Sequence, residues 1–342
     1  MAINEVAYAG VHDSVGLFDA SRSFGRLFAR GKDAIDLLHR MSTNDLMPME
    51  TAKGLAVLTV LTNEKGRIVD VLKVVRDEMG DVALITSKDK EQTVIQWLDK
   101  FTIMEDAQFV PATDMLAQYL LCGKSANSIL GKYATENLQG APNSAVFALH
   151  IGAANATLVK GPSLAGNGWF ILTAQEMAES VWKQLETDVL ASGGAVMDDD
   201  LFDLLRIENG MPLAPNELNE KHNPLETTIA KDAVSFTKGC YIGQEVIARL
   251  DAQGKVQRQL VGLQFAERVP KIGDRICDDA LAGTPLGEEI GEITSIAKSP
   301  AIGDIGLGYV RGKYANPDTV VSVKDHEGNK LSATLVIPPF NV

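Results

Sequence analysis

The sequence contains, at residues 238–245, the octapeptide Lys238-Gly239-Cys240-Tyr241-Ile242-Gly243-Gln244-Glu245. Its cysteine lies between two glycines, beside a lysine, at the predicted start of a helix. Glycine leaves room around the sulfur and permits backbone angles that other residues avoid. Lys238 and the N-terminus of the following helix would both favour the thiolate over the thiol. Although most free cysteines are inert core residues, this setting is typical of a cysteine that takes part in chemistry.

The octapeptide resembles the signature K-G-C-[FY]-x-G-Q-E of YgfZ-type proteins. These proteins are folate-binding relatives of the glycine cleavage T-protein and are associated with iron–sulfur cluster assembly and repair. The resemblance implies that Cys240 is a reactive thiol. It also marks six neighbours as motif positions, namely Lys238, Gly239, Tyr241, Gly243, Gln244 and Glu245.

A second match ends at Asp70, in the stretch Asn63-Glu64-Lys65-Gly66-Arg67-Ile68-Val69-Asp70. An isolated aspartate in a strand normally faces solvent, because its carboxylate is seldom buried. This stretch resembles the T-protein pattern N-x-x-G-G-x-x-D-D, in which the first of the two acids is the catalytic aspartate. Asp70 matches that acid, whereas Arg67 and Val71 replace the second glycine and the second acid. The resemblance implies a catalytic, folate-facing carboxylate at Asp70.

Glu208 falls on the inward stripe of a predicted helix, whose other members are Leu201, Leu204 and Leu205. A buried carboxylate without a partner would be costly, so we expect a nearby cation such as Arg206, backbone amides or a ligand. The segment Arg206-Ile207-Glu208-Asn209-Gly210 resembles the T-protein pattern Arg-[LI]-Glu-x-Gly. That resemblance implies cofactor-binding roles for Arg206 and Glu208, and a carboxylate can accept two parallel hydrogen bonds from a pterin.

Two further residues have both a structural and a ligand-binding interpretation. Arg249 follows Glu245 by four residues, so it either pairs with that carboxylate on the helix surface or meets an anionic ligand. Trp169 either belongs to the core or stacks on the flat ring of a cofactor.

Composition indicates a multidomain protein of the reducing cytoplasm. The 342 residues exceed one ordinary domain, and two or three domains are expected. No apolar run approaches the ~20 residues of a membrane span, so we expect no membrane partner. Residues 1–5 lack the features of a signal peptide. The net charge of −13 argues against a stable nucleic-acid partner.

Cysteine and histidine usage predicts no permanent metal. The three cysteines are too few and too far apart for a disulfide framework or a resident iron–sulfur cluster. The five histidines are scattered, with no pair at metal-ligand spacing.

Hydrophobic periodicity predicts hairpins and single helices in the first part of the chain. Two runs rich in β-branched residues predict strands at 55–62 and 68–75, and residues 63–67 between them predict a hairpin loop. Further strands are expected at 82–86, 115–123, 146–150 and 169–172, and helices at 31–41, 94–101 and 176–190. This mixture favours an α+β fold over a doubly wound parallel sheet.

From about residue 257 only short, regularly spaced strands are predicted, at 260–265, 289–294, 306–310, 320–324 and 331–337, with a turn at 325–329. This pattern indicates an all-β barrel or sandwich. We therefore expect a folate-binding region of two α+β lobes at 1–255 and a C-terminal β-barrel domain at 256–342. The resemblance implies that the three lobes surround a central folate channel, as in T-proteins.

The resemblance implies a tetrahydrofolate-binding protein that assists iron–sulfur cluster assembly or repair, with Cys240 as the thiol and with Glu208 and Asp70 holding or acting on the folate. Tetrahydrofolate or a one-carbon derivative would be the cofactor, and iron–sulfur enzymes or cluster-assembly proteins the transient partners. The alternative is a folate-dependent aminomethyltransferase or demethylase, in which Asp70 helps to position a one-carbon unit. T-proteins, however, carry F-I-G-[RK]-E where this chain has Cys-Tyr-Ile-Gly-Gln-Glu. A third possibility is a folate-binding scaffold with a structural cysteine.

Overall fold

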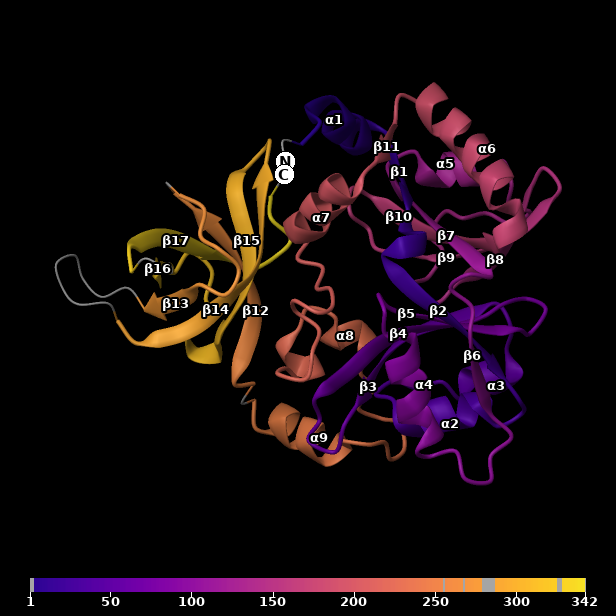
Figure 1. Ribbon diagram of the computed structural model, residues 1–342, viewed down its shortest axis with the longest axis horizontal. Coiled ribbons are helices and arrows are strands. Elements are labelled where there is room, and N and C mark those ends of the chain that lie inside the picture. The colour runs from indigo at the N-terminus through magenta and orange to yellow at the C-terminus, as the bar shows by residue number, and fades with distance from the viewer. Residues whose placement is uncertain (1–2, 255, 267, 279–286, 325–327, 342) are drawn as a thin grey trace. The chain divides into compact units, whose positions relative to one another are not determined.

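The computed structural model describes residues 3–254, 256–266, 268–278, 287–324 and 328–341, which form two compact units (Figure 1). The N-terminal unit consists of Asn4–Asp198 and Asp232–Gln244. The barrel unit consists of Asp199–Lys231 and Glu245–Val342, together with the N-terminal residues up to Ile3. The octapeptide therefore divides between the units, with Lys238 to Gln244 in the first.

A five-stranded sheet of the N-terminal unit carries Asp70. Every neighbouring pair in it is antiparallel, in the order β3-β4-β5-β2-β6. The strands are β2 (Phe24–Arg30), β3 (Leu55–Thr62), β4 (Ile68–Arg76), β5 (Val82–Ser87) and β6 (Gln108–Pro111). The β3–β4 hairpin forms where the two runs of β-branched residues predict it, because such side chains pack well on a pleated surface.

The second sheet of this unit has six strands in the order β11-β1-β7-β10-β9-β8. The β1–β11 pair is parallel and the other pairs are antiparallel. The strands are β1 (Val15–Asp19), β7 (Leu116–Gly123), β8 (Val146–Ile151), β9 (Ala154–Lys160), β10 (Asn167–Ala174) and β11 (Ala195–Met197). It contains Trp169.

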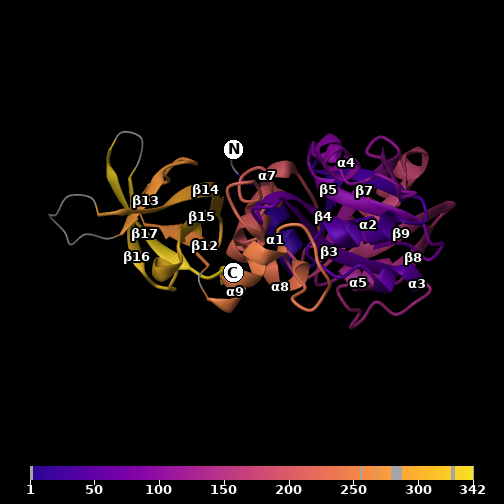
Figure 2. The same ribbon diagram turned by 90° about the horizontal axis from the view of Figure 1, so that it is seen from below.

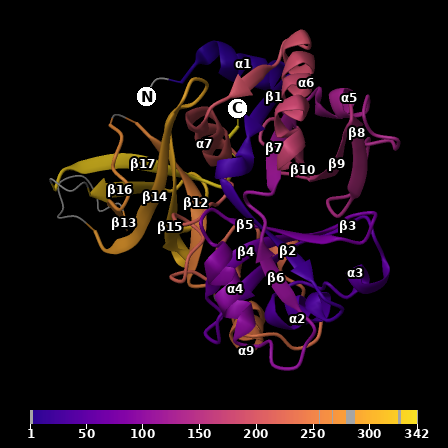
Figure 3. The ribbon, with the colours of Figure 1, turned by 45° about the vertical axis from the view of Figure 1, so that its right-hand side comes forward.

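Helices cover one face of each sheet and bury an apolar core there. Leu37 and Leu38 of α2 meet Val94 and Leu98 of α4 in the core beside the five-stranded sheet, where α2, α3 and α4 lie together (Figure 3). Helices α5 and α6 pack against the six-stranded sheet. The helices of this unit are α1 (Glu5–Asp13), α2 (Ala34–Met41), α3 (Pro48–Thr51), α4 (Glu91–Asp99), α5 (Ala126–Leu130) and α6 (Ala178–Ala191), with the 3₁₀ turns η1 (Ala20–Arg22) and η2 (Gln175–Met177).

The barrel unit contains a closed antiparallel barrel in the order β12-β15-β14-β13-β16-β17, with β12 and β17 also paired (Figure 2). Its strands are β12 (Arg258–Phe265), β13 (Arg275–Asp278), β14 (Glu289–Ser299), β15 (Gly303–Arg311), β16 (Val320–Lys324) and β17 (Lys330–Val336). Alternate residues such as Leu263, Ile293 and Val323 fill its interior. Helix α7 (Asp199–Glu208) lies against β14 and β15. The remaining elements are α8 (Ala230–Ala233), α9 (Gln244–Ala252), η3 (Pro224–Glu226) and η4 (Gly312–Tyr314).

The α+β class and the C-terminal barrel agree with the sequence analysis, whereas several strands had no clear sequence signal. Strand β2, for example, contains Arg26, whose buried guanidinium donates to the carbonyls of Phe24, Ser21 and Thr113. A charge in the middle of a strand hides its apolar pattern. Residues 325–327 of the predicted turn at 325–329, and the first two residues of the segment 1–5, lie outside the described residues. No helix in the described part of the chain is long and apolar enough to cross a membrane.

Candidate functional site

The cysteine loop, residues 238–243, packs against the β3–β4 hairpin of its own unit. Gly243 has a φ of +84°, and a Cβ there would lie 2.6 Å from the Asn63 carbonyl oxygen and 2.9 Å from the Gly66 Cα. Only glycine tolerates this backbone angle together with so close a neighbour. The Thr62 hydroxyl also donates to the Ile242 carbonyl at 2.5 Å. The end of the cysteine loop is therefore fixed on the hairpin by this hydrogen bond and by the close main-chain packing of Gly243.

Lys238 is buried, and its ammonium donates to three main-chain carbonyls. The acceptors belong to His39, Ser42 at 2.7 Å and Asn44 at 2.8 Å. The ammonium also lies 5.1 Å from the centroid of the Tyr241 ring. Burial lowers the pKa of Lys238 to about 8, against the opposing effect of a nearby aspartate. An ammonium has three N–H donors, and main-chain carbonyls accept from all three of them here.

Cys240 is exposed, whereas Cys122 and Cys277 are buried. Burial raises the pKa of the Cys122 thiol to about 12, and burial also raises that of Cys277. Gly239 has no neighbour within 4 Å of an added Cβ and no left-handed φ. The steric need for glycine that the sequence suggested therefore applies to Gly243 and not to Gly239.

The rest of the octapeptide leads into helix α9. Tyr241 is buried, which raises the pKa of its phenol to about 12. The Gln244 amide donates to the Tyr241 carbonyl at 3.2 Å, and α9 begins at Gln244, four residues beyond Cys240. Glu245 and Arg249 are both exposed, and no ion pair of the described residues joins them. A ligand-binding role for Arg249 stays a prediction.

Asp70 lies on β4 and is only 2% exposed, so it does not face solvent. Its Oδ2 accepts the Ser87 amide at 3.2 Å, whereas its Oδ1 has no hydrogen-bond partner among the described residues. Burial raises the pKa of this carboxyl to about 6, and hydrogen bonds from Ser87 oppose the rise. A carboxyl that titrates near neutral pH and keeps one free oxygen is suited to hold or transfer a proton.

We predict that Asp70→Asn raises the free energy of unfolding at pH 7.5. The folded-state pKa of about 6 exceeds the ordinary value of 3.8, so wild-type stability falls as the pH rises from about 4 to about 6 and stays low above it. Asparagine does not titrate. The variant should therefore be more stable than wild type by roughly 1–3 kcal/mol at pH 7.5, with the advantage shrinking towards pH 4.

Urea denaturation at both pH values measures this difference. Asp99→Asn, at an exposed position of the same unit, serves as the control and should show no such pH dependence. An Asp70→Asn protein that is less stable than wild type at pH 7.5 would contradict the prediction.

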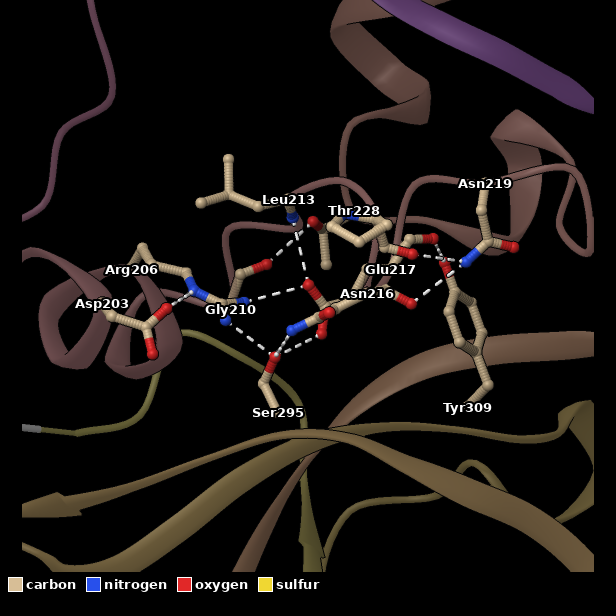
Figure 4. A network of polar contacts seen from close by, with 11 residues as sticks. Asp203, Arg206, Gly210, Leu213, Asn216, Glu217, Asn219, Thr228, Ser295 and Tyr309 are labelled. Carbon is tan, nitrogen blue, oxygen red and sulfur yellow. Dashed lines mark hydrogen bonds and ion pairs between the residues drawn. The ribbon is translucent and has the colours of Figure 1, made fainter. Parts of the chain in front are cut away.

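A buried polar network lies between α7 and the barrel (Figure 4). The Arg206 guanidinium donates to Asp203 at 2.7 Å, to Glu217 at 2.9 Å and to the Ser295 hydroxyl at 2.7 Å. The Ser295 hydroxyl in turn donates to Glu217 at 2.6 Å. Arg206 is 2% exposed and Glu217 is fully buried. All three guanidinium nitrogens of Arg206 are engaged inside the unit, so its predicted contact with a cofactor gives way to a structural role.

Glu208 is buried at 1% exposure, as its place on the helical stripe predicts. The C-terminal segment packs at the same end of α7. The Phe340 amide donates to the Glu208 carbonyl at 2.7 Å, and a Cβ on Gly210, whose φ is +64°, would lie 2.1 Å from the Pro338 Cβ. Glycine is thus required where the helix ends against the C-terminal segment.

Sequence reasoning missed the groups that surround Arg206. Glu217 and Ser295 lie 11 and 89 residues away in the sequence, where no local pattern links them to the helix. Tyr309 donates its hydroxyl to the Glu217 carbonyl at 2.9 Å and stacks on His222 with ring centroids 3.5 Å apart. Only the capping box of Asn223 and Glu226 has a readable local signature.

We predict that Arg206→Met lowers the free energy of unfolding of the barrel unit by about 3–5 kcal/mol, because it leaves Glu217 buried without its cation. Asp203→Asn is the matched control. Asp203 is half exposed, so its loss should cost about 0–1 kcal/mol. The double variant Arg206→Met/Glu217→Leu should regain much of the loss. Chemical denaturation checks all three, and equal costs for the two single variants would contradict a structural role for the buried pair.

Trp169 is fully buried in the core of the six-stranded sheet. Its indole N–H donates to the Asn127 side chain at 2.7 Å, and the Lys160 ammonium lies 4.1 Å from its ring centroid. The ring therefore acts as a core residue, and the alternative of stacking on a cofactor finds no open face in this structure.

Among the described residues, no group of three or more histidine, cysteine, aspartate or glutamate side chains is arranged to hold a metal ion.

Two family models together match most of the chain. Residues 3–238 match the GCVT N-terminal domain, and residues 258–341 match the glycine cleavage T-protein C-terminal barrel domain.

Curated relatives resemble the chain over nearly its full length. The aminomethyltransferase of Phocaeicola vulgatus is 27% identical over 98% of this chain and 92% of its own length, and that of Bacillus cytotoxicus is 29% identical over 97% and 88%. A putative chloroplast transferase of Arabidopsis thaliana is 28% identical over 93% of this chain and 69% of its own length. The crystal structure of the glycine cleavage system aminomethyltransferase T from Bartonella henselae has a TM-score of 0.81, at 21% identity over 98% of this chain and 89% of that one.

Proposed function

The chain belongs to the glycine cleavage T-protein family, and from this premise we propose that it binds a reduced folate and uses the Cys240 thiol in iron–sulfur cluster assembly or repair. The observation that carries the proposal is the exposure of Cys240 on a loop whose two ends are held by hydrogen bonds. An exposed thiol at a fixed place can bind a soft metal, carry a persulfide sulfur or exchange with another thiol. Iron–sulfur enzymes or cluster-assembly proteins would be its transient partners.

One buried acceptor of the N-terminal unit supports the proposed binding of a reduced folate. The Oδ1 atom of Asp70 is a buried acceptor without a hydrogen-bond partner among the described residues, and such an acceptor suits an N–H group of the folate. Tetrahydrofolate or a one-carbon derivative would supply nitrogen atoms that carry the one-carbon unit. Asp70 would orient the ligand and hold a proton beside it, because its pKa of about 6 leaves both protonation states accessible.

A second candidate function is folate-dependent aminomethyl transfer. Its first support is that relatives of the chain in Phocaeicola vulgatus and Bacillus cytotoxicus are named aminomethyltransferases. Asp70 also favours it, because a buried carboxyl with a raised pKa can orient a one-carbon carrier and exchange a proton with it. Cys240 favours the iron–sulfur candidate, because the transfer of a one-carbon unit to a folate does not require an exposed thiol.

We predict that Glu208→Gln weakens the binding of tetrahydrofolate by about 1–3 kcal/mol, because the amide replaces one charged acceptor with a donor. Isothermal titration calorimetry on the folded variant measures the change. Glu220→Gln, at an exposed position of the same unit, is the matched control and should bind as wild type does. Unchanged affinity in a folded Glu208→Gln protein would remove Glu208 from the folate site.

The two candidate functions are separated by Cys240→Ser and Asp70→Asn in two assays. We predict that Cys240→Ser folds and binds folate as wild type does but fails to support iron–sulfur enzymes in deletion cells, because a hydroxyl is neither a soft ligand nor a redox-active nucleophile. Asp70→Asn should impair the folate-dependent step. Full rescue by Cys240→Ser at equal protein level would overturn the iron–sulfur proposal. Aminomethyl transfer by purified protein that Asp70→Asn abolishes and Cys240→Ser leaves intact would establish the second candidate.

A further inference from the structure

Lys238 lies at the C-terminal end of helix α2, although 199 residues of sequence separate it from His39. The last carbonyls of an α-helix accept no hydrogen bond from an N–H group of the helix itself, so their donors must come from elsewhere. In α2 the Ser42 hydroxyl donates to the Leu38 carbonyl at 2.7 Å. The Lys238 ammonium donates to the next carbonyl, that of His39, and to the carbonyls of Ser42 and Asn44 beyond the helix. A cation is also favoured at this negative end of the helix dipole.

The second anchor of the cysteine loop follows Cys240 by two residues. It consists of the hydrogen bond from Thr62 to the Ile242 carbonyl and the close approach of Gly243 to the hairpin loop. Cys240 therefore lies midway between two fixed points, Lys238 and Ile242. A chain of so few residues has little freedom between fixed ends, so the anchors determine where the sulfur is presented.

We propose that Lys238 is a positioning residue, which fastens the cysteine loop to the end of α2 and thereby fixes the place of the exposed Cys240 sulfur. Its three N–H donors are used by three carbonyls, and this arrangement leaves it no donor for a thiolate. The functional consequence rests on the role proposed for Cys240. The anchoring itself does not, and it is measurable on the purified protein.

The test uses a nitroxide spin label on Cys240, which labels selectively because Cys122 and Cys277 are buried. In wild type, the electron paramagnetic resonance spectrum should show restricted motion. In Lys238→Met, which keeps the length of the side chain but has no donor, it should gain the narrow lines of a mobile label. Lys53→Met is the matched control, since the Lys53 ammonium donates to the Met79 carbonyl at 2.9 Å elsewhere in the same unit. Its spectrum should equal that of wild type.

The pH dependence of Cys240 alkylation by iodoacetamide distinguishes positioning from activation. Positioning predicts the same midpoint in Lys238→Met and wild type. A lysine that activates the thiolate would, on removal, shift the midpoint upward by about one pH unit or more. A mobile label with an unchanged midpoint supports the proposal. A shifted midpoint with a restricted label overturns it in favour of activation, and an unchanged label and midpoint overturn it as well.

Lys238→Arg serves if the methionine variant does not fold. Arginine keeps the charge, but its planar fork cannot aim donors at three converging carbonyls as an ammonium does, so the label should show intermediate mobility. A label as restricted as in wild type would again count against positioning. In deletion cells, Lys238→Met should lose the support that wild type gives. If Cys240→Ser supports those cells as well as wild type does, the proposed function fails. The spin-label result still decides whether Lys238 anchors the loop.

Discussion

The close approach between Gly243 and the β3–β4 hairpin loop is the contact on which the candidate chemistry of the N-terminal unit depends. A single methyl group at Gly243 would meet the Asn63 carbonyl at 2.6 Å. The same hairpin continues into β4, which carries Asp70. The cysteine loop and the buried carboxyl therefore share one rigid support, even though about 170 residues of chain lie between them. A displacement of the hairpin would move both groups together.

Each unit contains buried charged groups, and Arg206 and Glu217 of one unit are compensated to a different degree from Asp70 of the other. In the barrel unit, Arg206 and Glu217 compensate each other, and Ser295 bonds to both. A buried pair of this kind, in which each charge has the other as its partner, holds elements of the fold together. In the N-terminal unit, Asp70 keeps one oxygen without a partner among the described residues and has a raised pKa. An incompletely satisfied buried group is costly, and such groups are concentrated at functional sites.

Local patterns in the sequence predicted the elements whose packing follows their own periodicity. The β3–β4 hairpin, α7 with its buried Glu208, and strands β14 to β17 of the barrel are of this kind. Long-range polar contacts were not predictable, because no local pattern specifies them. The octapeptide predicts that Lys238 favours the thiolate, but no local pattern predicts that its ammonium donates to carbonyls nearly two hundred residues away. Arg206 likewise matched a ligand-binding pattern but is engaged by Ser295, which lies 89 residues further along the chain.

The burial of two of the three cysteines has a consequence for redox chemistry. A thiol oxidised to sulfenic acid is commonly resolved by a neighbouring cysteine of the same protein. Cys122 and Cys277 are inside the cores of their units, where they cannot reach an exposed sulfur without local unfolding. Neither of the other two cysteines can therefore serve as a resolving cysteine for Cys240 in the folded protein. If Cys240 is oxidised, the thiol that reduces it has to come from another molecule.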